Sequence, residues 1–313
     1  MKPTFFPTME SSSTTRSKPS ILKASAKCPE GTVPIRRTQK DDLTNAKPPK
    51  ANFGGNDSSN SVGQYIAGYL YQAIGEAYYG VSASINVFNP DMVASDQFSA
   101  AEIMVAAGPF TEMNAIYAGW MVQPNLYGNN DTRLFAFTTI DGGKTGCYNT
   151  LCPGFVQVDP SFTPSTPLLD KYSTFGGTQH TIDVNIYQDP ATKNWWLMYE
   201  KNISIGYWPN SLFPLFTAGG SFLYWGGNVM NAGEKPAPRM GSGRFPDGDY
   251  QHACYFEHIQ YIDASYKPVD PQADNMKEMS HQCGDWYRVR YFGLSKEGRG
   301  HTFQFGGPGG ICY

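Results

Sequence analysis

The sequence predicts an all-β protein, an antiparallel β-sandwich of two packed sheets with at most one short helix. The 313 residues include 20 Tyr, 19 Phe and 6 Trp, which are enriched in strands. They also include 33 Gly and 23 Pro, which are typical of tight turns between many short strands. Several segments alternate their side chains with a period of two, and no repeat of 20–50 residues suggests a propeller or solenoid.

The region 114–159 combines strand-like runs with turns and a close cysteine pair. Within it, residues 133–139 alternate as expected of a strand whose two faces are both covered. Asp141-Gly142-Gly143 then turns the chain. A disulfide between Cys147 and Cys152 would close a small loop and fix local shape more than global stability.

Further alternating runs bring the set to about ten strands. Asn89-Pro90 ends the first of these runs, since proline offers no amide to a ladder. Residues 208–213 provide a capped start for one short helix, which Pro214 either opens or limits to a turn. The other predicted strands are 83–88, 98–105, 116–122, 181–187, 195–199, 221–227, 255–262, 287–292 and 301–305.

Composition divides the chain into two parts. Residues 1–60 are rich in Ser, Thr, Lys, Pro and Asn with no sustained period, so we expect them to be largely irregular. Residues 61–313 form the folded domain. As written, the N-terminus has no apolar core of a signal peptide, and no run is long enough to span a membrane.

Charge and motifs exclude several functions. A net charge of −3 gives no electrostatic argument for nucleic acid or an anionic membrane as a partner. No H-E-x-x-H or paired C-x-x-C pattern indicates a metal, and the glycine-rich run 306–310 lacks the lysine and helix of a phosphate loop. We therefore expect no metal and no cofactor. Oligomeric state is not determined by the sequence.

Cysteines and glycosylation motifs favour an extracellular protein. Six cysteines allow two plausible pairs, Cys147 with Cys152 and Cys283 with Cys312, leaving Cys28 and Cys254 unmatched. The Asn-x-Ser/Thr acceptor motif for N-glycosylation occurs three times, at Asn56, Asn130 and Asn202.

Several motifs together resemble one known family. CPEGTVPIRRT at 28–38 resembles the neprosin activation peptide. Four further segments resemble the neprosin domain: AGW at 118–120, TRLF at 132–135, TGCYNTLCPGFVQ at 145–157 and WGG at 225–227. The resemblance implies a plant protein of the extracellular space or cell wall, related to a glutamic endopeptidase that cuts after proline. It also implies a β-sandwich with a cleft across one sheet, and identifies residues 1–60 as a truncated activation-peptide remnant and linker.

The resemblance implies where the catalytic pair lies and that both of its members are substituted in this sequence. In the family one glutamate precedes the small-Gly-Trp triplet and the other follows Trp-Gly-Gly. Here these positions are Tyr117 and Asn228. A tyrosine is a poor base at working pH and an amide cannot act as one. We therefore expect a catalytically degenerate homologue that keeps a cleft for proline-rich peptide.

Two alternatives remain. An active prolyl endopeptidase would need a displaced carboxylate, and the candidates near the two positions are Glu112 and Glu234. A carbohydrate-binding or cell-wall module would need an open aromatic platform. The aromatic residues proposed to line the cleft are Trp120, Tyr224 and Trp225, although tryptophans in a sandwich are more often core.

Overall fold

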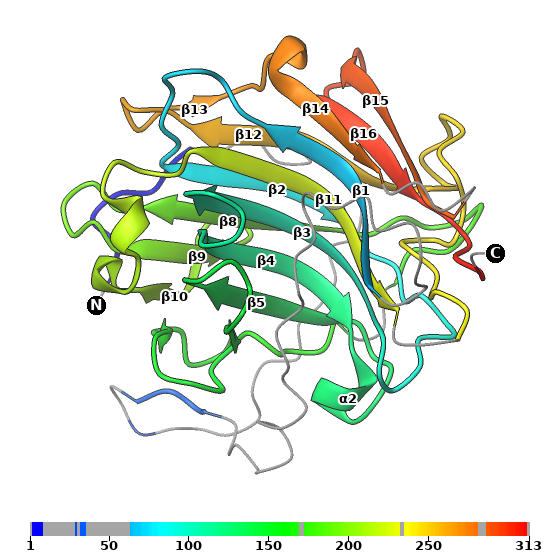
Figure 1. Cartoon of the computed structure of the whole chain (residues 1–313), viewed down its shortest axis with the longest axis horizontal. Coiled ribbons are helices and arrows are strands. Elements are labelled where there is room, and N and C mark those ends of the chain that lie inside the picture. The colour runs from blue at the N-terminus through cyan, green and yellow to red at the C-terminus, as the bar shows by residue number, and fades with distance from the viewer. Residues whose placement is uncertain are drawn as a thin grey trace.

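The computed structural model shows two antiparallel sheets packed face to face (Figure 1). It describes residues 2–8, 29, 32–35, 63–168, 172–231, 235–280 and 286–311. Within these ranges the only α-helix is the four-residue α2 (Pro124–Tyr127). The predicted fold class, an antiparallel sandwich with at most one short helix, is confirmed.

The first sheet has seven strands, and its middle is formed by three long strands that are buried along their length. In spatial order it contains β14 (Met276–Ser280), β1 (Gly63–Tyr71), β11 (Phe222–Asn231), β3 (Phe98–Ala107), β4 (Asn114–Val122), β5 (Arg133–Thr139) and β6 (Cys147–Tyr148). Strand β3 therefore lies between β11 and β4, although β11 is more than a hundred residues away in the sequence.

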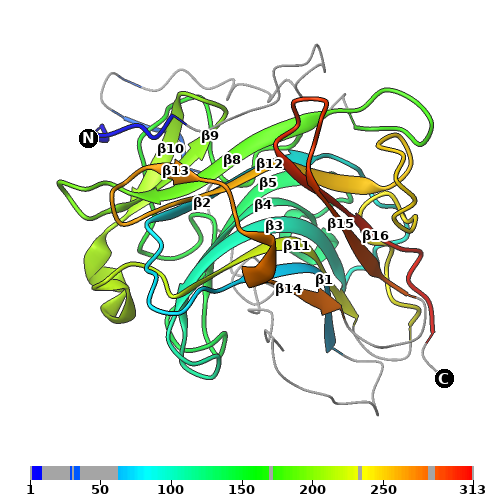
Figure 2. The ribbon, with the colours of Figure 1, turned by 90° about the horizontal axis from the view of Figure 1, so that it is seen from above.

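The second sheet has nine strands and covers one face of the first (Figure 2). Its order is β15 (Arg288–Leu294), β16 (His301–Gly306), β12 (Cys254–Ile262), β2 (Gly80–Asn86), β8 (Thr181–Gln188), β9 (Trp195–Tyr199), β10 (Ile203–Trp208) and β7 (Val156–Gln157), with β13 (Pro268–Val269) also paired to β12. The turn at residues 189–194 joins β8 to β9 as a hairpin, between two strands predicted at 181–187 and 195–199.

Among the described residues, buried apolar side chains form three clusters. The largest cluster fills the space between the sheets and includes Trp120, Trp195 and Trp225, each fully buried. A second cluster covers the outer face of the seven-stranded sheet, and a third covers part of the outer face of the nine-stranded sheet. Because the central strands are covered on both faces, they carry few charged residues.

The helical element expected at 208–213 takes a different form. The chain makes two short 3₁₀ turns there, η1 (Asn210–Leu212) and η2 (Pro214–Phe216). Pro214 has no amide hydrogen with which to continue a helix begun at Asn210. The α-helix α2 lies elsewhere. It starts with Pro124 and is capped after Tyr127 by Gly128, whose positive φ of 77° suits glycine. Another 3₁₀ turn, η3 (Ala273–Asn275), precedes β14.

Two tryptophans fix the first sheet to one strand of the second. The Trp120 indole Nε1 donates to the carbonyl of Asn86 at 2.8 Å. The Trp225 indole donates to the carbonyl of Ser82 at 3.0 Å. Both acceptors belong to β2, so β4 and β11 are held to the same strand across the core. A buried indole N–H needs such a partner, and these bonds fix which residues of β4 and β11 face inward.

We predict that Trp225→Phe lowers the free energy of unfolding by about 2 kcal/mol, because it removes buried volume and leaves the Ser82 carbonyl without this donor. Urea unfolding followed by circular dichroism measures the change. The control Leu294→Ala alters a side chain that is 65% exposed and should change stability by no more than about 0.5 kcal/mol. Equal effects of the two substitutions would contradict the role given to the indole.

Candidate functional site

Tyr117 and Asn228, which the resemblance matches to the family's glutamate pair, lie on the outer face of the seven-stranded sheet, on either side of a glutamate. In the register of β3, Glu102 pairs with Gly119 of β4 and with Gly226 of β11. Tyr117 and Asn228 are each two residues from these glycines, so they share the outer face with Glu102. Tyr117 lies diagonally toward one end of β3 and Asn228 toward the other.

The motifs that flank the site explain this arrangement. In Ala118-Gly119-Trp120 and Trp225-Gly226-Gly227, the tryptophan points into the core and the adjacent glycine to the outer face. Because side chains alternate along a strand, the residue three positions from each tryptophan also points outward. The inward bonds of the two indoles thus place Tyr117 and Asn228 on the site face.

Glycine is required next to Glu102 because the backbone there is crowded. A Cβ at Gly119 would lie 2.0 Å from the carbonyl oxygen of Ala101. At Gly226 it would lie 2.3 Å from the hydroxyl of Tyr224 and 2.6 Å from the Cα of Gly68. Glu102 is therefore flanked by bare backbone on both neighbouring strands, and its carboxyl group is enclosed by side chains from further along the sheet.

Glu102 and Asn228 form a buried pair. Asn228 Nδ2 donates to Glu102 Oε1 at 2.9 Å, and the two residues are 3% and 4% exposed. They line a cavity of about 10 Å³, which has room for about one water molecule. The wall is mainly apolar and is completed by Phe98, Tyr117, Met121, Phe135, Phe137 and Tyr148, with Gln64, Thr139 and Gly143.

Polar atoms at this cavity remain available to a small ligand. Asn228 Oδ1 and Gln64 Nε2 have no hydrogen-bond partner among the described residues, although both atoms are buried. One is an acceptor and the other a donor. A water molecule in the cavity would therefore meet Glu102 and at least one more polar group, which is the usual requirement for an ordered buried water.

Burial governs the protonation of Glu102. Removal from water raises the pKa of its carboxyl group to about 7, while the hydrogen bond from Asn228 acts in the opposite direction by favouring the charged form. Both protonation states are thus populated near neutral pH. Carboxyl groups with this behaviour are frequent among acid and base catalysts, although structural groups also show it.

Three tyrosines surround Glu102 and stay neutral. Burial raises the pKa of Tyr117, Tyr148 and Tyr224 well above the usual value, and a negative charge on Glu102 raises each further. Tyr117 also packs against Phe137, with ring centroids 5.7 Å apart. Tyr117 therefore offers an O–H group and an aromatic ring, and it cannot supply the base that a glutamate would provide.

The proposed displaced carboxylate Glu112 does not line this cavity. Glu112 is exposed in the turn between β3 and β4, where its amide donates to the carbonyl of Pro109. Glu234 lies outside the described residues. The carboxylate that does line the cavity, Glu102, was missed by the sequence reasoning. Its signal was present, because it is the one acidic residue in the apolar run 98–107.

The three aromatic residues expected in the cleft lie on opposite faces of the seven-stranded sheet. Trp120 and Trp225 lie in the core between the sheets, because they alternate with outward-facing glycines. Tyr224 lies on the site face, where it is buried and its hydroxyl donates to the carbonyl of Gly227 at 2.9 Å. Only Tyr224 of these three therefore contributes to the surroundings of Glu102.

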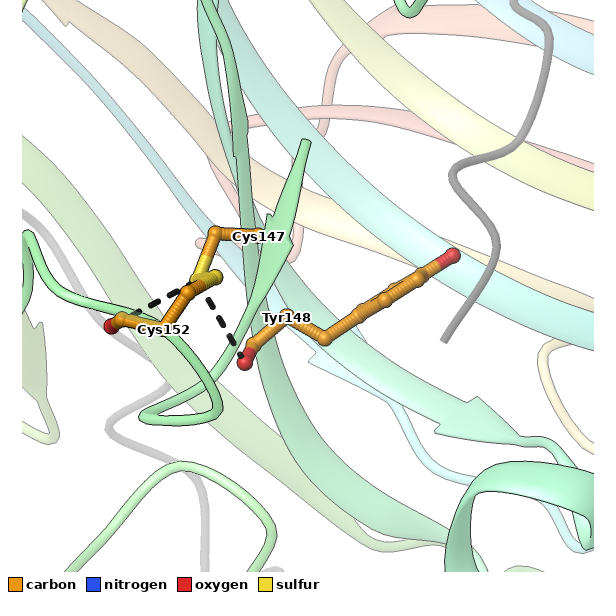
Figure 3. Close-up of a disulfide and its surroundings, with 3 residues drawn as sticks. All are labelled: Cys147, Tyr148 and Cys152. Carbon is orange, nitrogen blue, oxygen red and sulfur yellow. Dashed lines mark hydrogen bonds between the residues drawn. A yellow bond between two sulfur atoms is a disulfide. The ribbon is translucent and has the colours of Figure 1, made fainter. Parts of the chain in front are cut away.

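The expected disulfide between Cys147 and Cys152 is formed beside the site (Figure 3). Cys147 precedes Tyr148 on β6, and the Tyr148 ring points away from the disulfide (Figure 3). That ring packs on Phe137 with centroids 4.6 Å apart and lines the Glu102 cavity. The small covalent loop thus holds one wall of the site.

The remaining candidate residues lie away from Glu102. Asn130 and Asn202 are exposed. Asn56, Cys283 and Cys312 lie outside the described residues. Cys254 is a buried free thiol. In the described ranges no group of three or more His, Cys, Asp or Glu side chains is arranged to hold a metal, and no helix is long and apolar enough to cross a membrane.

A family model named Neprosin matches residues 95–308, which include β3, β4 and β11 and all three central residues of the site. The chain belongs to the neprosin family. Two solved structures are also similar to it, both of scytalidoglutamic peptidase bound to transition-state analogues. They are 10% and 12% identical to this neprosin-family chain, with TM-scores of 0.40 and 0.42. Each match covers 78% of this chain and 98% of the other.

We predict that Glu102 makes the protein less stable as the pH rises. Its pKa is about 7 in the folded chain and near 4.5 when unfolded, so the folded state binds more protons between these values. Stability from this group is fully present below pH 4.5 and is lost by pH 7. Glu102→Gln should remove this slope and raise the free energy of unfolding at pH 8 by about 3 kcal/mol.

Urea unfolding of both proteins at pH 5 and pH 8 tests this expectation. Glu112→Gln, in an exposed turn, is the matched control and should leave the pH dependence unchanged. The same pH slope in the wild type and in Glu102→Gln would show that the carboxyl group is solvated in the folded protein.

Proposed function

We propose that the protein is a catalytically degenerate member of the neprosin family, which binds proline-rich extended peptide along the outer face of the seven-stranded sheet without cutting it. The observation that carries this proposal is the composition of the cavity. Its lining contains one carboxylate, Glu102, and this group is held by Asn228 in a space for about one water molecule.

The chemistry expected of a glutamic peptidase needs two functions at once. One carboxylate must take a proton from the attacking water, and a second group must support the carbonyl oxygen as negative charge develops. In this chain an Asn228 amide hydrogen is already donated to Glu102, and the Tyr117 hydroxyl stays protonated. A second carboxylate is missing from the described cavity lining, which favours binding without turnover.

The surface around the site suits a peptide ligand. Aromatic and aliphatic side chains of the second buried cluster extend from β1 across β11, β3, β4 and β5 to β6. Proline rings pack favourably on aromatic faces and an extended proline-rich chain loses little entropy on binding. We propose that a peptide crosses these strands over the region of Glu102.

A second candidate function is favoured by one observation. Glu102 has a pKa of about 7 and adjoins a cavity large enough for a water molecule, so its carboxylate form is a candidate general base. Hydrolysis would then use Glu102 in place of Glu112 or Glu234 as the displaced carboxylate. A carbohydrate platform is not favoured, because the six tryptophans are all buried.

Cleavage of a proline-containing fluorogenic peptide distinguishes these functions. We expect wild type to bind the peptide without cutting it. The variant Tyr117→Glu/Glu102→Gln/Asn228→Glu should gain cleavage after proline by at least about 100-fold over the wild-type background, since it restores two carboxylates. Glu102→Gln within this variant avoids a third carboxylate in the same apolar space.

Assays from pH 4 to pH 8 on full-length proteins complete the test, with Glu112→Gln as a control that should behave as wild type. Wild-type cleavage that rises through pH 7 and disappears in Glu102→Gln would contradict the proposal of a catalytically degenerate protein and support the second candidate function. No binding of proline-containing peptide by any of the proteins would contradict the proposed ligand.

A further inference from the structure

A short N-terminal segment lies on the opposite side of the molecule from the Glu102 cavity. Residues 2–8, with the sequence KPTFFPT, run along the outer face of the nine-stranded sheet near β9 and β10 (Figure 2). The segment belongs to neither sheet, and the first strand of the described residues is β1, from Gly63. Its contacts are therefore made to a face that the sandwich presents independently of the segment.

That face carries a patch of aromatic side chains, here called the aromatic patch. Tyr187 and Trp196 are buried, and they are joined by Tyr79, Tyr207 and Tyr266 at its edges. Tyr79 packs on Tyr266 and Trp196 packs on Tyr207, each with ring centroids 4.9 Å apart. The Phe5 ring of the segment contacts two of these rings, Tyr187 and Tyr266. These two rings would lose that cover if the segment left, and exposed apolar surfaces commonly mark interaction sites.

The segment is held by specific groups as well as by apolar contact. The Thr4 amide and hydroxyl both donate to the carboxylate of Asp189, the hydroxyl at 2.8 Å. The Tyr187 hydroxyl donates to the carbonyl of Phe5 at 2.8 Å. The Phe5 ring meets Tyr187 and Tyr266 edge to face, with centroids 6.3 and 6.2 Å apart. Pro3, one residue before Thr4, is buried.

Asp189 is prepared for this contact by the fold itself. It lies in the β8–β9 turn, where the amides of Ala191 and Thr192 donate to its Oδ1 atom. Burial alone would raise its pKa, but the hydrogen bonds from Thr192, Thr4 and Ala191 hold the pKa below the usual value. The carboxylate is thus fixed in the charged form and presents Oδ2 to the amide and hydroxyl of Thr4.

We propose that the aromatic patch is a second peptide-binding site, which takes an extended segment with a hydroxyl residue followed by an aromatic residue, and that residues 2–8 occupy it in cis. Asp189 accepts hydrogen bonds from the amide and hydroxyl of the first residue. The Tyr187 hydroxyl donates to the carbonyl of the second residue, and the rings of Tyr187 and Tyr266 pack against its aromatic side chain.

The site extends beyond the segment's central residues. A hollow of about 650 Å³ adjoins the patch and is lined by Lys2 and Phe6 of the segment together with Val156, Val158, Asn202 and Tyr207, among others. A longer ligand would have room to continue there. Because none of the contacts to Thr4 or Phe5 depends on a covalent link, a separate peptide of the same pattern can make them.

Binding of a free peptide to full-length protein tests the proposal. The probe is fluorescein-labelled KPTFFPT, measured by fluorescence anisotropy. In Thr4→Val/Phe5→Ser the chain's own segment loses its hydroxyl bonds and ring contacts, so the patch becomes available. We expect this variant to bind the probe at least about tenfold more tightly than wild type, in which the tethered segment competes at high effective concentration.

Two further comparisons establish where the probe binds. Adding Tyr187→Phe to the Thr4→Val/Phe5→Ser variant should weaken probe binding roughly fivefold. The substitution removes the hydrogen bond to the carbonyl of the probe's first Phe and keeps the ring. A probe with Val in place of Thr should bind roughly tenfold more weakly, since the buried Asp189 loses its hydroxyl partner. Unfolding curves confirm that both chains are folded.

The proposal is overturned if the Thr4→Val/Phe5→Ser variant binds the probe no better than wild type. It is also overturned if Tyr187→Phe and the Val probe leave the affinity unchanged. These outcomes are independent of the peptide-cleavage assay, because the aromatic patch and the Glu102 cavity lie on outer faces of different sheets.

Discussion

The arrangement of the site depends on the hydrogen bonds from two buried indoles to a single strand. Trp120 and Trp225 donate to carbonyls of β2, so strands β4 and β11 present fixed residues to the core. Alternation along each strand then sends Tyr117 and Asn228 to the outer face. Strand β3 lies between them and supplies Glu102 at the row of the two flanking glycines. Tyr117 and Asn228 thus lie on the same face of the sheet as Glu102.

The carboxylate at the centre changes what such a site can do. Glu102 is enclosed by aromatic rings and accepts a hydrogen bond from Asn228. Because its pKa is about 7, a substantial fraction of its carboxyl groups is protonated near neutral pH. The neighbouring tyrosines stay neutral, so Glu102 is the group whose charge responds to pH in this cavity. One such group in a small apolar space can orient a ligand or a water molecule. The two-carboxylate chemistry of a glutamic peptidase needs more than this.

Local patterns were sufficient to predict the fold class, since period-two runs and aromatic content predicted the sandwich. Positions 117 and 228 came from the resemblance of the triplets around Trp120 and Trp225 to the neprosin family. Glu102 was not predicted because Glu112 was chosen for its closeness to Tyr117 in the sequence. Glu102 is close to Tyr117 in space, since it lies on the adjacent strand β3. The order β11-β3-β4 is a long-range feature that strand periodicity does not contain. Contact between residues 2–8 and the second sheet is long-range for the same reason.

The most direct test of the account is a carbon-13 NMR titration of the glutamate side-chain carboxyl groups in the full-length protein, with Glu102 assigned by its loss in Glu102→Gln. The account predicts that Glu102 titrates with a midpoint of about 7. It also predicts that Asn228→Ala moves the midpoint upward, because the hydrogen bond that favours the charged form is removed. A midpoint near the ordinary glutamate value, unchanged by Asn228→Ala, would contradict a closed cavity with one buried carboxylate.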